Sequence, residues 1–127
     1  MKARFRETLA RGVALFNRQE FYAAYTAWES GWADVAEERV LLQGLIQVAA
    51  GFYKLQVGEP RGAMALLEQG ARKLRGHVVN ALGMDLAALL PEVEAWRAEA
   101  QRLMNEERAS FDPGRFPKLT YTSPVTH

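Results

Sequence analysis

The segment that most restricts how this chain can fold is residues 41–50, LLQGLIQVAA, which is apolar at almost every position. A helix that is apolar nearly all round is typically buried. Its two glutamines, Gln43 and Gln47, lie one turn apart and share one face of that helix. Burying an amide without a hydrogen-bond partner costs roughly 1–3 kcal/mol. We therefore expect a central helix whose amides meet polar partners, a water or a ligand, which makes it the first place to look for a site.

Apolar residues at helical spacing predict five helices separated by short breaks. Gly58 is a plausible terminator of the third helix, and Pro60 suits the first turn of the fourth. Asp85 is the expected N-cap of the fifth helix, with Pro91 as a second candidate for its first turn. The predicted helices cover residues 2–16, 21–32, 37–57, 60–75 and 86–109.

The 127 residues suffice for one domain, with a helical core over 2–110 and an irregular tail over 111–127. Three prolines interrupt the tail, yet its aromatic residues leave open whether part of it packs across the helices. Residues 16–29 and 55–68 resemble each other weakly, each placing a turn before a helix with a small residue. The predicted fold is an all-α five-helix bundle of two tetratricopeptide-like hairpins plus a C-terminal helix, with two ordinary hairpins as the alternative.

Charge and cysteine content narrow the class of protein. The net charge is only +1, which argues against a nucleic acid or an anionic membrane as partner. There is no cysteine, so disulfides, a thiol nucleophile and cysteine-ligated metals are excluded. No apolar run approaches the roughly 18 residues of a membrane span, and the N-terminal residues scatter Arg and Glu where a signal peptide is apolar. These features predict a cytoplasmic protein.

The candidate site combines one face of the second predicted helix with one side of the third. Helical spacing places three residues together on each, so facing helices would enclose a carboxylate, a phenol, two amides and an ammonium. If burial raised its pKa, Glu29 could act as a general acid or base, which makes it the catalytic candidate. The alternative is a satisfied polar network between helices, with the lysine reaching outward. The six candidates are Tyr25, Glu29, Trp32, Gln43, Gln47 and Lys54.

Other residue types are better explained by structure than by chemistry. The two histidines, His77 and His127, have no nearby partner at metal-ligand spacing. Gly44 and Gly51 lower helix propensity by about 1 kcal/mol each, so we expect them to allow close helix packing. An aromatic-rich set predicts the core, and part of it could serve self-association instead. That set is Phe21, Tyr22, Trp28, Trp32, Phe52, Tyr53 and Trp96.

The strings LFNRQEFYAAYTAWESGW and LLQGLIQVAAGFYKLQVGEPRGAMALLEQGARKL resemble the bacterial and archaeal family catalogued as domain of unknown function 309. The resemblance covers about residues 11–74 and includes the QGLIQ-x-A-A and G-x-x-x-GA patterns. It implies a small helical bundle whose members are sometimes labelled, by prediction only, metal-dependent hydrolases. That label is associated with a His-Glu-x-x-Glu pattern, where this chain has Tyr25 and Thr26 and keeps only Glu29. Lys54 stands where members often carry a histidine.

These observations predict a non-catalytic domain that binds a small polar ligand or a protein, self-associates, and carries a polar pocket between the second and third helices. Glu29 would accept from a donor of the ligand, and Tyr25 and Trp32 would form walls. The alternative is the metal-dependent hydrolase that the resemblance implies, with Glu29 as ligand or base. One carboxylate, one phenol and two amides suit a divalent metal poorly, so no cofactor is expected.

Overall fold

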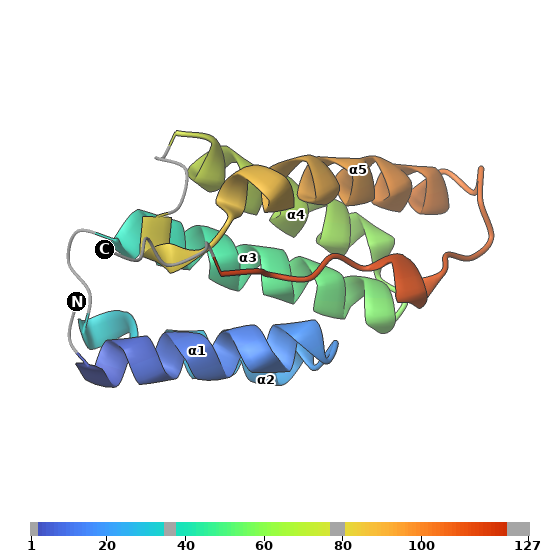
Figure 1. Cartoon of the computed structure of the whole chain (residues 1–127). Helices are drawn as coiled ribbons and strands as arrows, with labels where there is room; N and C mark the ends of the chain where they lie inside the picture. Colours follow the sequence, from blue (N-terminus) through green and yellow to red (C-terminus); the bar gives the residue numbers. More distant parts are fainter. Residues whose placement is uncertain (1–2, 35–37, 77–80, 122–127) are drawn as a thin grey trace.

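The computed structural model describes residues 3–34, 38–76 and 81–121, and the fold over these residues is an all-α bundle, as predicted (Figure 1). Three short 3-10 turns, η1 (Trp32–Asp34), η2 (Ala81–Gly83) and η3 (Pro113–Arg115), join or follow the helices. Within the described ranges, no helix combines the length and the apolar character needed to cross a membrane. The five helices are α1 (Ala3–Asn17), α2 (Phe21–Ser30), α3 (Arg39–Gln56), α4 (Pro60–Arg75) and α5 (Leu86–Met104).

Local signals explain where most helices begin and end. Pro60 opens α4, and the Asp85 carboxylate accepts a hydrogen bond from the Ala88 amide at 3.0 Å, which caps α5. Pro91 lies inside α5 rather than in its first turn. Helix α3 ends before Gly58, which adopts a left-handed φ of 78°.

The predicted end of the fifth helix at residue 109 is wrong. Helix α5 stops at Met104 because Glu106 takes a left-handed φ of 61°. The Glu106 amide donates to Leu103 O at 3.2 Å and the Glu107 amide to Arg102 O at 2.9 Å, which together form a Schellman cap. Glycine usually occupies such a position, so a cap at a glutamate could not be predicted from residue type.

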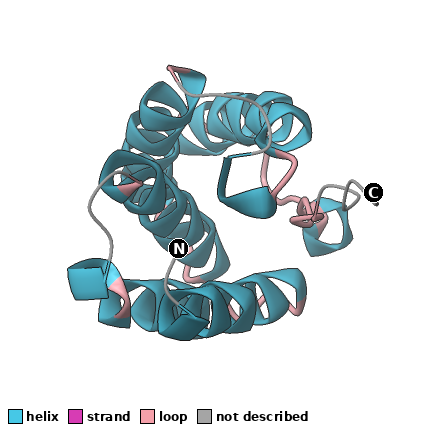
Figure 2. Ribbon diagram, turned by 60° about the vertical axis from the view of Figure 1, so that its left-hand side comes forward, coloured by secondary structure: helices cyan, strands magenta, loops and turns pink. Residues whose placement is uncertain are grey.

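Each α-helix packs on the next one along the chain, and α3 lies between α2 and α4 (Figures 1 and 2). The α3–α4 contact depends on missing side chains, as predicted from the glycines of the third helix. A Cβ atom added at Gly51 would lie 2.8 Å from Leu67, and one added at Gly44 would lie 3.1 Å from Lys73 Cβ. Gly70 on α4 faces the same contact. Whether the hairpins are true tetratricopeptide units stays a prediction.

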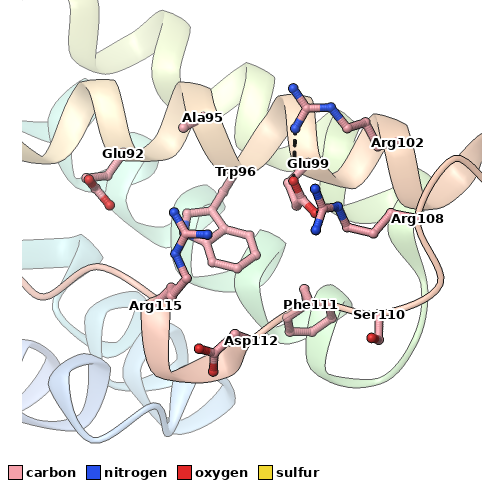
Figure 3. Close-up of a pocket in the computed structure, with 10 residues that line it drawn as sticks. All are labelled: Glu92, Ala95, Trp96, Glu99, Arg102, Arg108, Ser110, Phe111, Asp112 and Arg115. Carbon is pink, nitrogen blue, oxygen red and sulfur yellow. Dashed lines mark hydrogen bonds and ion pairs between the residues drawn. The ribbon is translucent and has the colours of Figure 1, made fainter.

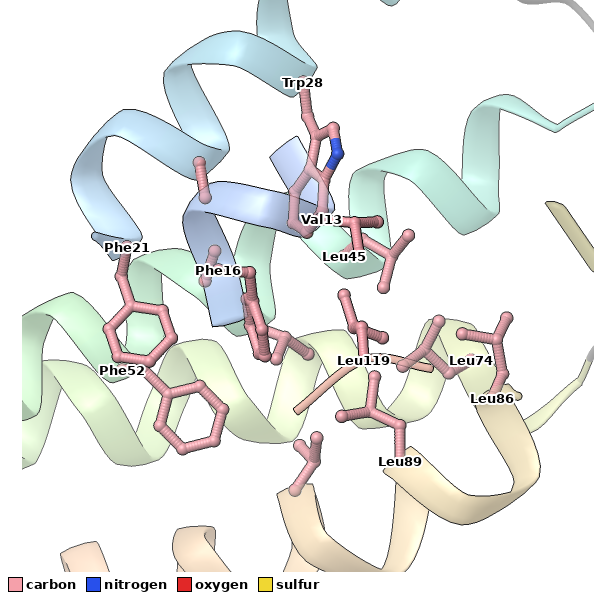
Figure 4. Packing of buried hydrophobic residues seen from close by; sticks show 14 of the residues in the cluster. Val13, Phe16, Phe21, Trp28, Leu45, Phe52, Leu74, Leu86, Leu89 and Leu119 are labelled. Carbon is pink, nitrogen blue, oxygen red and sulfur yellow. The ribbon is translucent and has the colours of Figure 1, made fainter. Parts of the chain in front are cut away.

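The core is continuous and rich in aromatic rings (Figure 4). Phe52 of α3 stacks on Phe21 at 5.2 Å between ring centroids and also contacts Phe16 edge-on at 5.9 Å. Trp28 is fully buried, and its indole N–H donates to Leu9 O at 3.1 Å. Phe21, Trp28, Phe52 and Trp96 of the predicted aromatic set are therefore core residues, whereas Tyr22 is 56% exposed.

The segment after α5 packs across the helices, which answers the question left open by its sequence. Its Phe116 and Leu119 are buried in the core. The Asn17 side chain at the end of α1 holds the segment with two hydrogen bonds, donating to Leu119 O at 2.8 Å and accepting from the Leu119 amide at 2.7 Å. Tyr121 forms an isolated antiparallel bridge with Met84. In Figure 2 this segment lies on the inner side of the curved helical layer.

Candidate functional site

Four of the six predicted site residues line one surface groove between α2 and α3. The groove has a volume of about 410 Å³. Helix α2 and the η1 turn supply one wall, and α3 supplies the other. Its lining residues are Glu29, Trp32, Gln43, Ile46 and Gln47.

The expectation that both amides are buried is wrong. Gln43 is exposed and Gln47 is only half-buried, and the described residues include no buried polar side chain. The reason is that α3 is buried on two of its sides. Large residues such as Leu45 and Phe52 face the core, and Gly44 and Gly51 lie against α4. The glutamines occupy the remaining outward side.

Gln47 is already satisfied within the chain. Its carbonyl oxygen accepts from Lys73 Nζ at 2.8 Å, and its amide nitrogen donates to Gln69 Oε1 at 3.1 Å. These bonds join α3 to α4, which is the cross-linking role weighed as the alternative to ligand binding. Gln43 has no such partner among the described residues.

The Glu29 side chain is exposed and makes no ion pair or hydrogen bond with the described residues. The acid–base role considered for Glu29 required burial, which is absent here. At one end of the same groove, the Arg39 guanidinium lies 5.2 Å from the centroid of the Trp32 ring, a cation–π distance.

Tyr25 lies beside the groove and packs with Tyr22 and Tyr53. We call these three residues the tyrosine cluster. The ring centroid of Tyr25 lies 5.2 Å from that of Tyr22 and 6.3 Å from that of Tyr53. The centroids of Tyr22 and Tyr53 are 5.3 Å apart. Burial, and then the neighbouring Tyr22 and Glu29, raise the pKa of the Tyr25 phenol above its ordinary value. Tyr25 therefore stays a hydrogen-bond donor at neutral pH.

Lys54 does not join the groove. Its ammonium pairs with the Glu59 carboxylate at 3.1 Å and lines a separate surface hollow near Gly62. Exposed pairs of this kind contribute little stability. Lys54 is thus a surface residue of the α3–α4 turn rather than part of the Glu29 groove.

The side chains around Glu29 do not fit a metal site. Within residues 3–34, 38–76 and 81–121, no three His, Cys, Asp or Glu side chains are grouped so as to hold a metal ion. His77 and His127 lie outside the described residues. Glu29 alone would supply one carboxylate, whereas zinc sites take three or four ligands.

A larger hollow of about 770 Å³, which sequence reasoning missed, lies between α5 and the segment that follows it (Figure 3). Trp96 and Phe111 form an edge-to-face pair there, 5.7 Å between centroids. The Glu99 carboxylate contacts Arg102 at 3.0 Å and Arg108 at 2.6 Å. Arg108 follows the helix, so this pair ties the C-terminal segment to α5. No local pattern could reveal the hollow, because its two sides become neighbours only when the tail folds back.

The fold and the groove between α2 and α3 define a small helical-bundle domain with an open surface site. Residues 9–66 match the family described as "Domain of unknown function (DUF309)". The match confirms the resemblance seen in the sequence. It includes every residue of the α2–α3 groove, whereas the hollow beside Glu99 lies outside it. No curated protein matches the chain.

Proposed function

We propose that this chain is a non-catalytic protein-interaction domain and that it binds through the outward side of α2 and α3. We call this surface the α2–α3 face. The proposal rests on the continuity of the face: the tyrosine cluster passes directly into the Glu29 groove through Tyr25, which lies one helical turn before Glu29. The face consists of Tyr22, Tyr25, Glu29, Trp32, Gln43, Ile46 and Tyr53.

The composition of the face supports a protein partner. Tyrosine and tryptophan are enriched at protein interfaces, because a ring buries much apolar area while its polar atom can still form a hydrogen bond. Tyr22 is 56% exposed, and Tyr25 and Trp32 are half-buried against the core, so their rings are held in place yet remain accessible. Glu29 and Gln43 add polar groups to this apolar surface.

The shape of the face favours a protein over a small ligand. Small-molecule sites commonly enclose roughly 70–90% of the ligand's surface. Here Glu29 and Gln43 are exposed on opposite walls of an open groove, so a small molecule would stay largely in water. A protein surface can cover such a groove completely. We also propose a cytoplasmic role, because a chain without cysteine suits a reducing compartment.

The test compares two identical substitutions at exposed helical glutamines. Gln43→Arg places a long charged side chain in the groove, and Gln101→Arg places one on the exposed side of α5. Affinity capture from the source cells, quantified by mass spectrometry, should recover the same partners with the wild type and Gln101→Arg and lose them with Gln43→Arg. Partners retained equally by both variants would contradict binding through this face.

The hydrolase alternative has a separate readout. Elemental analysis of the purified protein should show no zinc, manganese or iron whose amount depends on Glu29. Stoichiometric metal that disappears in Glu29→Gln would replace the interaction role with the hydrolase role.

A further inference from the structure

We infer that the partner of the α2–α3 face is a second copy of the same chain. A two-fold axis would relate the two copies, so that their α2 helices lie antiparallel. This inference rests on the proposed function and names the occupant of its surface. Two observations support it: unused hydrogen-bond donors toward one end of the face and unused acceptors at the other.

The donors lie along the first half of α2 and beside it on α3. The phenol groups of Tyr22, Tyr25 and Tyr53 form no hydrogen bond with other residues of the described chain. A phenol O–H that becomes buried at an interface requires an acceptor. This end can therefore be covered favourably only by a surface that supplies acceptors.

The acceptors gather at the other end, where α2 finishes. The Glu29 carboxylate is acceptor-only when ionised, and the Gln43 amide offers a carbonyl oxygen. Both side chains are exposed, and neither forms a hydrogen bond or ion pair with another residue of the described chain. Gln47 is excluded from this role because Lys73 and Gln69 already use its amide.

Within one copy, the Tyr22 phenol cannot reach the Glu29 carboxylate. Tyr22 and Glu29 are seven residues apart on α2, which separates them by about 10 Å along the helix. A two-fold axis lying in the interface and perpendicular to the helices reverses the helix direction. It therefore places Tyr22 of each copy over Glu29 of the other, twice per dimer, as an isologous interface requires.

The middle of the face suits contact with itself. The axis would pass near Tyr25, so that Tyr25 and Ile46 of one copy lie against the same residues of the other. Both are half-buried and already packed on the core, so little side-chain freedom is left to lose. Helix α2 is about 15 Å long and α3 about 27 Å, and each is about 10 Å wide, so together they offer a footprint of about 420 Å². This is about half of the roughly 800 Å² per partner of a standard interface, which is the size of a weak dimer contact.

The experiment exchanges charge between positions 22 and 29 in the full chain, with mass measured by analytical ultracentrifugation over a range of concentrations. The wild type should dimerise. Tyr22→Glu sets two carboxylates against each other, and Glu29→Lys removes the acceptor, so each should weaken the dimer at least tenfold. Glu107→Lys, an exposed charge reversal outside the face, is the control and should leave the dimer unchanged.

Mixing the two single variants supplies the decisive readout. In a mixed dimer, the carboxylate introduced at position 22 lies opposite the ammonium introduced at position 29, while the second pair remains wild type. We expect the mixture to form heterodimers more tightly than either variant alone forms homodimers. Circular dichroism of each variant checks that the fold is retained.

Three results would overturn this inference. They are a wild type that stays monomeric at every concentration, a dimer insensitive to both single substitutions, and single variants that fail to recover on mixing. The first result leaves the proposed function intact, since the capture experiment with Gln43→Arg tests binding to any protein. Loss of captured partners together with a monomeric wild type would therefore assign the face to a different protein.

Discussion

The contact between α3 and α4 gives the sharpest prediction about stability, because two glycines of the same helix should respond to alanine in opposite directions. A Cβ atom added at Gly70 would lie 2.7 Å from Val48 Cγ2 and 2.9 Å from the backbone oxygen of Gly44. Carbon atoms prefer separations of about 3.5–4.0 Å, so both contacts are repulsive. A backbone oxygen within a helix cannot rotate away. Gly70→Ala can therefore be accommodated only by moving α4 away from α3.

Gly62 near the start of α4 is the matched control. A Cβ atom there would lie 3.6 Å from the nearest atoms, which belong to the flexible side chain of Lys54. Alanine favours a helix over glycine by about 1 kcal/mol in either position. For Gly62→Ala that gain should remain, raising the free energy of unfolding by roughly 0.5–1 kcal/mol.

For Gly70→Ala, overpacking should exceed the propensity gain. Overpacked cores typically lose about 1–3 kcal/mol, and the backbone contact places this site near the upper end. We expect a net loss of about 2 kcal/mol, which leaves the two variants separated by roughly 3 kcal/mol. At about 4 °C per kcal/mol, Gly70→Ala should melt about 8 °C below the wild type.

Urea unfolding followed by circular dichroism and tryptophan fluorescence measures both variants. All proteins should be compared at one concentration, because self-association would make apparent stability depend on it. If Gly70→Ala were stabilised as much as Gly62→Ala, the close approach of α3 and α4 at this point would be refuted.

Two further predictions concern the C-terminal segment and the tyrosine cluster. Asn17→Ala removes both hydrogen bonds to Leu119, so the free energy of unfolding should fall by about 1–3 kcal/mol, and hydrogen exchange of the Leu119 amide should accelerate more than that of core helical amides. Unchanged exchange at Leu119 would contradict this anchoring role. Because the pKa of Tyr25 is raised in the folded state, the unfolded chain loses this proton first as the pH rises above 10.0. Stability should therefore decline from that pH up to the folded pKa, and Tyr25→Phe should decline less in alkaline urea titrations.

The sequence predicts the helices well wherever a local signal marks their ends. Pro60 and Asp85 stand where α4 and α5 begin, and Gly58 follows α3, because each residue type suits the backbone or hydrogen-bonding demand of its position. The same cap that Gly58 forms is formed after α5 by Glu106. Glutamate does not favour a left-handed φ, so its residue type does not mark this helix end.

The candidate site was predictable as a pair of helix faces but not as a surface. Helical spacing placed Glu29 and Trp32 together and Gln43 and Gln47 together, and the structure brings both pairs into one groove. Spacing alone could not show which side of α3 faces the solvent. The apolar content of α3 suggested a helix that is buried on all sides. Glycine and alanine add to that apolar content whether they contact a neighbouring helix or the solvent.

The close α3–α4 contact also explains why the site is an open face rather than a cavity. Gly44, Gly51 and Gly70 let α4 approach so closely that, at these positions, the two helices are in direct contact. Large residues of α3 such as Leu45 and Phe52 are buried in the core. The remaining rings and amides of α3 therefore lie on its outward side, next to α2. Nothing in the described chain covers that side, so the rings there can lose their remaining contact with water only when another molecule binds. For this reason enclosure of the groove depends on association, and the charge-exchange experiment at positions 22 and 29 tests that dependence directly.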